Sequence, residues 1–165
     1  MKKIGVLMMS LIMFFTFSFD IIHAQELSGE AEKLSQIKEL RESIKQHLKD
    51  NKKIEIQIEK SSKKVEKVLV KLPQNSLVSQ EIIDEQISPK LEMIMSQLMQ
   101  VGEYETSSWK HLNTANRLIK NKKYDAGVKH LGKANADLQE KHELMIVFEQ
   151  DLEEFLIFIN SLQHK

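Results

Sequence analysis

Residues 124–162 read YDAGVKHLGKANADLQEKHELMIVFEQDLEEFLIFINSL, and this stretch decides the fold. Large side chains recur at every seventh position without a gap, at Tyr124, Leu131, Leu138, Met145, Leu152 and Ile159. A companion row lies three residues further on, at Ala134, Phe148, Phe155 and Leu162. Hydrophobic heptads sustained over four or more repeats are typical of helices that pack as in coiled coils. The stretch therefore predicts a long helix over residues 124–163 that supplies the main packing seam.

Two earlier segments repeat this pattern with interruptions. In residues 28–72, Asn51 interrupts a row whose apolar members are Ile37, Ile44, Ile58, Val65 and Leu72. In residues 89–120, two neighbouring rows are formed by Leu91, Leu98, Leu112 and Ile119 and by Ile94, Val101 and Ala115. We expect both segments to be helical. Because Ile54-Glu-Ile-Gln-Ile58 alternates with period two, a β-hairpin within residues 50–72 is the alternative.

Turn signals separate these segments. Pro73-Gln-Asn-Ser76 ends the first, and Ser79 is a candidate cap for a short helix through Ile87. Ser88-Pro89 offers a capping hydroxyl followed by a proline at the first helical position. Asn121-Lys-Lys123 is short enough for an antiparallel hairpin. We predict an all-α, elongated antiparallel three-helix bundle, with a short extra helix between the first two of its long helices, near 28–72, 89–120 and 124–163.

Residues 1–24 have the layout of a secretory signal peptide. Met1-Lys2-Lys3 is basic, Ile4 to Phe19 is almost unbroken apolar sequence, and Ile22-His23-Ala24 is a candidate cleavage site. The apolar run is short for a helix that crosses about 30 Å of hydrocarbon. We expect export, cleavage after Ala24 and one helical-bundle domain over residues 25–165, secreted or retained in the cell envelope. An uncleaved membrane anchor is the alternative.

Composition excludes several classes of protein. The chain carries 24 basic and 24 acidic side chains, so it lacks the positive excess that general nucleic-acid binding requires. It has no cysteine, which excludes disulfides, thiol catalysis and cysteine–zinc sites. No phosphate-binding loop, His-Glu-x-x-His or Gly-x-Ser-x-Gly motif is present. The carboxylates alternate with lysines at the spacing of exposed helix surfaces. We expect no catalytic residue and no cofactor.

Three methionines offer a metal-binding alternative. Met93, Met95 and Met99 cluster in one segment, and thioethers are ligands for copper(I). Met95 and Met99 stand beside the row of Leu91 and Leu98, so we expect them in the core, where methionine fills gaps. No two of the histidines at 47, 111, 130, 142 and 164 share a helix face at four-residue spacing. We therefore assign no metal site and keep copper binding as an alternative.

The C-terminal segment predicts a contact surface. Phe155-Leu-Ile-Phe-Ile159 contains five consecutive apolar residues, which exceeds what one helix face buries. Acidic residues precede it, whereas helices that lie on anionic membranes favour basic ones. We expect Phe155, Ile157 and Phe158 to contact a protein partner or a second copy of the chain. Membrane association, as in a toxin-like helical protein, is the alternative.

Residues 108–139 resemble a single degenerate tetratricopeptide repeat. The positions that carry the resemblance are Ala115, Leu118, Tyr124, Asp125, Leu131 and Ala134. His111 and Thr114 depart from the pattern, which has large apolar residues there, and Gly127 replaces an alanine. The resemblance implies a tight helical hairpin and protein–protein binding rather than catalysis. The sequence as a whole predicts an exported bacterial protein that acts as a structural or interaction module of the envelope or extracellular space.

Overall fold

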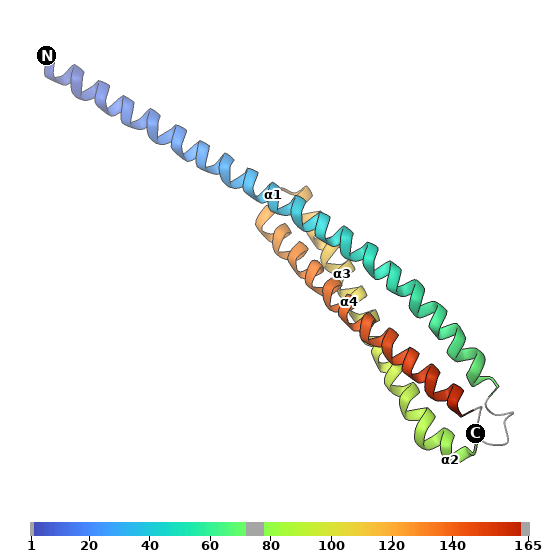
Figure 1. Ribbon diagram of the computed structural model, residues 1–165. Helices are drawn as coiled ribbons and strands as arrows, with labels where there is room; N and C mark the ends of the chain where they lie inside the picture. Colours follow the sequence, from blue (N-terminus) through green and yellow to red (C-terminus); the bar gives the residue numbers. More distant parts are fainter. Residues whose placement is uncertain (1, 72–77, 163–165) are drawn as a thin grey trace.

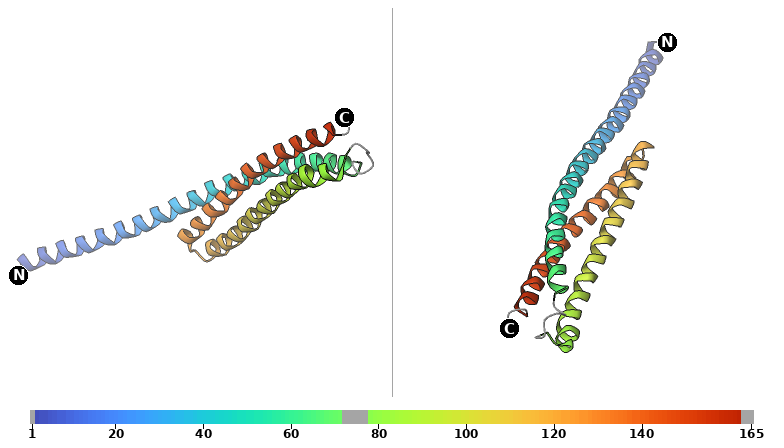
Figure 2. Two further views of the ribbon diagram at one scale, coloured as in Figure 1. Left: turned by 90° about the horizontal axis from the view of Figure 1, so that it is seen from below. Right: turned by 90° about the vertical axis from the view of Figure 1, so that its right-hand side faces the viewer.

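The computed structural model describes the backbone of residues 2–71 and 78–162, and the side chains of residues 29–71 and 78–162. Its elements in chain order are α1 (Lys2–Leu69), α2 (Gln80–Ile82), the π-helical turn η2 (Ile83–Ile87), α3 (Ser88–Lys120) and α4 (Tyr124–Ser161). Figures 1 and 2 show α1, α3 and α4 side by side, which makes the bundle elongated. The predicted all-α bundle of three long helices is confirmed over the described residues.

α4 is the central helix, because it packs along both α1 and α3. α1 and α4 run in the same direction, and α3 runs the opposite way (Figure 1). A hydrogen bond of 3.1 Å from Asn51 Nδ2 to Leu138 O, residues 87 apart in the sequence, holds the two parallel helices in register. Equivalent heptad positions of α1 and α4 therefore meet in the interior, as in a parallel coiled coil.

Two apolar clusters fill the interior, one toward each end. The cluster near the α3–α4 turn contains Ile37, Ile44, Ala115, Leu131, Ala134 and Leu138. The cluster at the opposite end contains Val65, Ile87, Ile94, Phe148, Leu152, Phe155, Ile159 and Leu162. Both α4 rows are buried from Leu131 onward, so the prediction that residues 124–163 supply the main seam is confirmed.

The prediction for the second segment is only partly correct. Ile94, Val101 and Ala115 form the buried row of α3. Leu98, from the neighbouring row, is 47% exposed. Rows three residues apart lie on adjacent faces of one helix, and the side on which α4 lies decides which of them is buried.

The prediction that Ser88 caps the second long helix is wrong, because Ile87 is the N-cap residue of α3 and no side chain caps it, whereas Pro89 does lie in the first turn. Ser79 does cap α2, because its hydroxyl accepts a hydrogen bond of 3.3 Å from the Ile82 N–H. The chain then continues through η2 into α3 without a break. Pro89 has no N–H, and its ring crowds the preceding turn. The wider π turn, closed by a bond from the Ser88 N–H to Ile83 O, accommodates the ring. The short extra helix is therefore joined to α3.

Two further predictions concern α1. The β-hairpin alternative for residues 50–72 is wrong over its described part, because the helix continues through Leu69. The expected start near residue 28 is also wrong, because α1 begins at Lys2. The side chains of the leader over residues 1–24, and the turn at residues 73–76, lie outside the described part of the chain.

The α3–α4 turn is as tight as the sequence predicts. Lys122 adopts a left-handed conformation with φ of 58°, and the Lys123 N–H bonds to Leu118 O at 2.9 Å. This is the Schellman arrangement, which satisfies the last carbonyls of a helix. Gly127 then allows α4 to approach α3, since a Cβ atom there would lie 2.6 Å from Cγ1 of Ile119. That close approach explains the glycine where the tetratricopeptide pattern has alanine.

Candidate interaction surface

The methionines lie where the sequence analysis did not place them. Met93, Met95 and Met99 are 46%, 57% and 68% exposed, so the expectation that Met95 and Met99 belong to the core is wrong. The reason is the orientation of α3, which turns Ile94 and Val101 toward α4. Met95 and Met99 are four residues apart and share a face, whereas Met93 lies on another. The structure therefore does not bring the three thioethers together.

Met95 and Met99 belong to a continuous stripe on the solvent side of α3. We call this stripe the α3 face; it consists of Met95, Leu98, Met99, Gly102, Thr106 and Trp109. All its members are exposed, and Trp109 retains 48% of its accessible surface. A shallow hollow of about 610 Å³ lies over Gly102 and Thr106, where side chains are small. The stripe spans about 21 Å at 1.5 Å per residue. Four of its six members, Met95, Leu98, Met99 and Trp109, are large apolar side chains.

The predicted C-terminal contact residues divide between core and surface. Phe155 is buried, and Phe158 packs partly against the same apolar cluster. The ring centroids of Phe155 and Phe158 are 6.4 Å apart, and Lys90 Nζ lies 5.5 Å from the centroid of Phe158. Ile157 is 71% exposed. Of the three residues, Ile157 is the one whose side chain faces solvent.

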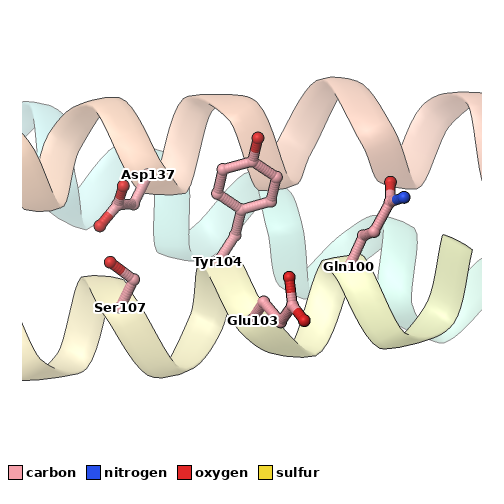
Figure 3. A pocket seen from close by; sticks show the side chains of 5 residues that line it. All are labelled: Gln100, Glu103, Tyr104, Ser107 and Asp137. Carbon is pink, nitrogen blue, oxygen red and sulfur yellow. The ribbon is translucent and has the colours of Figure 1, made fainter.

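A polar hollow between α3 and α4 was not anticipated from the sequence. It has a volume of about 520 Å³ and is lined by Gln100, Glu103, Tyr104, Ser107 and Asp137. Figure 3 shows the Tyr104 ring reaching from α3 toward α4, and the Asp137 carboxylate reaching from α4 toward Ser107. These five side chains include no imidazole that could serve as a general base for the serine. The hollow is lined by amide, hydroxyl and carboxylate groups that can form hydrogen bonds.

A polar layer separates the two apolar clusters. Lys141 is 4% exposed, and its Nζ lies 2.9 Å from Glu55 Oε1 of α1 and 3.3 Å from Glu105 Oε2 of α3. Burial raises the pKa of Glu55, but hydrogen bonds and charge from Lys141 and Lys52 outweigh it and hold the pKa below its ordinary value. Lys141 is therefore paired with a carboxylate on each flanking helix.

Asn51, which precedes Glu55 by one turn of α1, completes this layer. Its Nδ2 donates to Leu138 O, so its Oδ1 is the acceptor for His142 Nδ1, at 2.9 Å. A buried asparagine at this heptad position of a parallel helix pair fixes the register of the helices. The layer therefore aligns α1, α3 and α4.

Two histidines meet across the α3–α4 hairpin. His111 Nδ1 and His130 Nδ1 are 3.0 Å apart, and both rings are partly exposed. Burial lowers the pKa of His130, and the positive charges of His111, Lys133, Lys129 and Arg117 lower it further. Spacing within one helix does not reveal this pair, because one histidine belongs to α3 and the other to α4. His111 lies ten residues before the turn at residues 121–123 and His130 seven residues after it, so the hairpin itself is the signal that brings them to neighbouring levels.

The comparisons with known proteins leave the family open. No family model, no curated protein and no solved structure matches this chain. The tetratricopeptide resemblance therefore stays a hypothesis that rests on packing positions in one hairpin. Among the described residues, no helix has the length and apolar character that a bilayer span requires. The same part of the chain holds no group of three or more His, Cys, Asp or Glu side chains that could bind a metal ion.

Proposed function

We propose that this chain is an exported, non-catalytic bacterial protein that acts as an interaction module of the cell envelope or extracellular space. We further propose that it assembles with a second copy through the α3 face. The observation that carries this proposal is the stripe of large apolar side chains that α3 leaves in water. An apolar stripe of this kind is typical of protein contacts. Export is supported by the signal-like layout of residues 1–24.

A second copy is the proposed partner because the α3 face matches itself when two helices pack antiparallel. With Gly102 at the crossing point, Met95 of one copy lies opposite Trp109 of the other. Leu98 lies opposite Thr106 in the same arrangement. Thioethers make favourable contacts with aromatic rings, and glycine lets two helix backbones approach closely.

The flanking charges favour the same arrangement. Glu92 and Lys110 are both exposed and lie beyond the two ends of the α3 face. Antiparallel packing places Glu92 of one copy within about one helical turn of Lys110 of the other. Parallel packing would instead align like charges, which is unfavourable. One helix face of about 21 Å is small for an interface, so we expect weak, reversible dimers.

Trp109 makes the proposal measurable, because it is the single tryptophan of the chain. We expect its fluorescence emission to shift to shorter wavelength as protein concentration rises. Sedimentation velocity should show a monomer–dimer equilibrium over the same range. Met99→Glu places a charge in the centre of the α3 face and should give monomers with unchanged helix content. Val147→Glu places the same charge at another exposed apolar residue, on α4, and is the control; Val147 is 47% exposed and Met99 68%.

Gly102→Leu sharpens the test. A Cβ atom at Gly102 would contact nothing within 4 Å in the single chain, so this variant should fold normally. It should nevertheless weaken dimers by blocking the close approach. Monomers at all concentrations would contradict the proposal. Dimers abolished by Ile157→Ser but not by Met99→Glu would assign the contact to the C-terminal residues instead. Dimers unaffected by either substitution would exclude both surfaces.

A further inference from the structure

We propose that His111 and His130 form a binding site for a divalent transition-metal ion, with copper(II) the best match. This inference is independent of the proposed self-association, because both ligands belong to one chain. One imidazole comes from α3 and the other from α4, on either side of the hairpin turn. Imidazole nitrogen is a common ligand for copper, nickel and zinc.

The separation of the two nitrogen atoms is short enough for one metal ion to contact both. A metal–imidazole bond measures about 2.0–2.1 Å, so two such bonds at a right angle place their nitrogens about 2.9 Å apart. A tetrahedral angle would separate them by about 3.4 Å for the same bond length. The observed distance between His111 Nδ1 and His130 Nδ1 is 3.0 Å. This distance is also that of the hydrogen bond between the rings, so it shows that one ion can reach both nitrogen atoms. The choice of copper(II) follows from the order in which imidazole sites bind divalent first-row ions.

The hydrogen bond between the rings already brings the two ligand atoms together. One Nδ1 atom donates a proton and the other accepts it, so one lone pair is directed at the site. When the donor ring shifts its proton to Nε2, both Nδ1 atoms present lone pairs. The ring torsion of histidine is broad, so both lone pairs can turn toward a common ion without a backbone change. No proton leaves the protein in this step.

Solvent and charge set the strength of the site. Both rings are partly exposed, so water can supply the remaining ligands. Neutral imidazole is the form that binds metal. The positive charges of Lys129, Lys133 and Arg117 act on His130 and also repel a divalent cation. With two protein ligands and this opposing charge, we expect modest affinity, highest for copper(II) among the divalent first-row ions.

The test uses untagged protein purified from the cells that make it, with aqueous copper(II) as the probe. Electron paramagnetic resonance of the complex should show hyperfine coupling to two nitrogen nuclei. The melting midpoint should rise with copper(II) concentration, because the ion joins α3 to α4 only in the folded state. His111→Gln and His130→Gln should each abolish that rise. His47→Gln, at a partly exposed histidine of α1, is the matched control and should retain it.

Three results would overturn the proposal. The first is a spectrum of the unaltered protein without nitrogen coupling, which decides the matter even if a variant fails to fold. The second is a rise in melting midpoint that survives in the double variant of His111 and His130. The third is a rise that is lost on replacing Met95 and Met99 by leucine but not on replacing the histidines. That last result would assign copper to the thioethers.

Discussion

Two polar side chains interrupt the heptads of α1 and α4 at the same level of the bundle. Asn51 on α1 and Lys141 on α4 occupy positions that are apolar elsewhere in their rows, and both are buried. Neither is left without a partner, since Asn51 bonds to Leu138 and His142 and Lys141 pairs with two carboxylates. An unpaired buried charge would be strongly destabilising, and pairing removes most of that cost. We infer that these residues contribute alignment more than net stability.

The pairing of Lys141 with Glu55 predicts acid sensitivity. Because the pKa of Glu55 is lower in the folded chain than its ordinary 4.5, the unfolded chain binds the proton more readily. The stabilising contribution of Glu55 is therefore fully present above pH 4.5 and is lost as the pH falls through the lower folded-state value. We expect the melting midpoint of the unaltered protein to fall more steeply over this window than that of Glu55→Gln.

Lys141→Met supplies a second arm of this experiment. It removes the cation while keeping a long side chain, and the carboxylate of Glu55 remains partly solvated. Only one partner of the pair is replaced, but the side chains of Glu55 and Glu105 are 35% and 50% exposed, so water can solvate both carboxylates and the variant should remain folded at pH 7. Its midpoint should be as insensitive to acid as that of Glu55→Gln. Identical pH profiles for all three proteins would contradict the role assigned to the pair.

Sequence periodicity predicts the buried face of α4 but not that of α3. The two rows of residues 124–162 predict the buried face of α4. Apolar residues occupy nearly every position of both rows, so only one orientation of the helix buries them. In α3 the rows of Leu98 and of Val101 lie on adjacent faces and are both apolar. Periodicity therefore predicts a broad apolar stripe but does not show which of the two rows packs against α4. Ser108 completes the buried row of α3, and its hydroxyl bonds to Glu105 O at 2.8 Å. Because Ser108 is polar, the apolar pattern of the sequence does not show that this row is the buried one.

The end of α3 predicts a stabilising substitution. Lys122 holds a left-handed conformation, which costs a residue with a Cβ atom about 1–2 kcal/mol. Glycine adopts this conformation freely, although it loses about 0.5–1 kcal/mol more backbone entropy on folding. Lys122→Gly should therefore raise the free energy of unfolding by up to about 1 kcal/mol, measured by urea denaturation.

Lys120→Gly is the matched control for the turn. It makes the same chemical change two residues earlier, inside the last turn of α3. Glycine within a helix is unfavourable, so this variant should lower the free energy of unfolding by about 1 kcal/mol. Equal destabilisation by both substitutions would show that the Lys122 conformation carries no strain.

The sites of the whole molecule depend on how separate segments meet, which periodicity does not reveal. His111 and His130 are 19 residues apart, and they meet because the chain reverses at residues 121–123. Glu55, Glu105 and Lys141 come from three different helices. The exposed methionines were misplaced for a related reason, since their burial depends on which side of α3 faces α4. The fold class and the α4 core follow from the sequence, whereas these sites follow from the assembled bundle.

The division of the core into two clusters leads to a prediction about cooperativity. Leu138 belongs to one cluster and Leu152 to the other, with the polar layer of Asn51 and Lys141 between them. α4 runs through both clusters without interruption, so loss of packing at one end should propagate along it to the other. Leu138→Ala and Leu152→Ala should each lower the free energy of unfolding by about 2–5 kcal/mol.

Calorimetry distinguishes one cooperative bundle from two independent halves. If α4 couples the clusters, each variant melts in a single transition whose midpoint lies below that of the unaltered protein. Ile157→Ala, at a side chain that is 71% exposed, should change the free energy of unfolding by less than about 0.5 kcal/mol. A melt with two transitions, of which Leu138→Ala shifts one and Leu152→Ala the other, would show that the polar layer separates the bundle into two folding units. We expect the single transition, because Lys141 and Asn51 join the three helices at the level where the apolar contacts are interrupted.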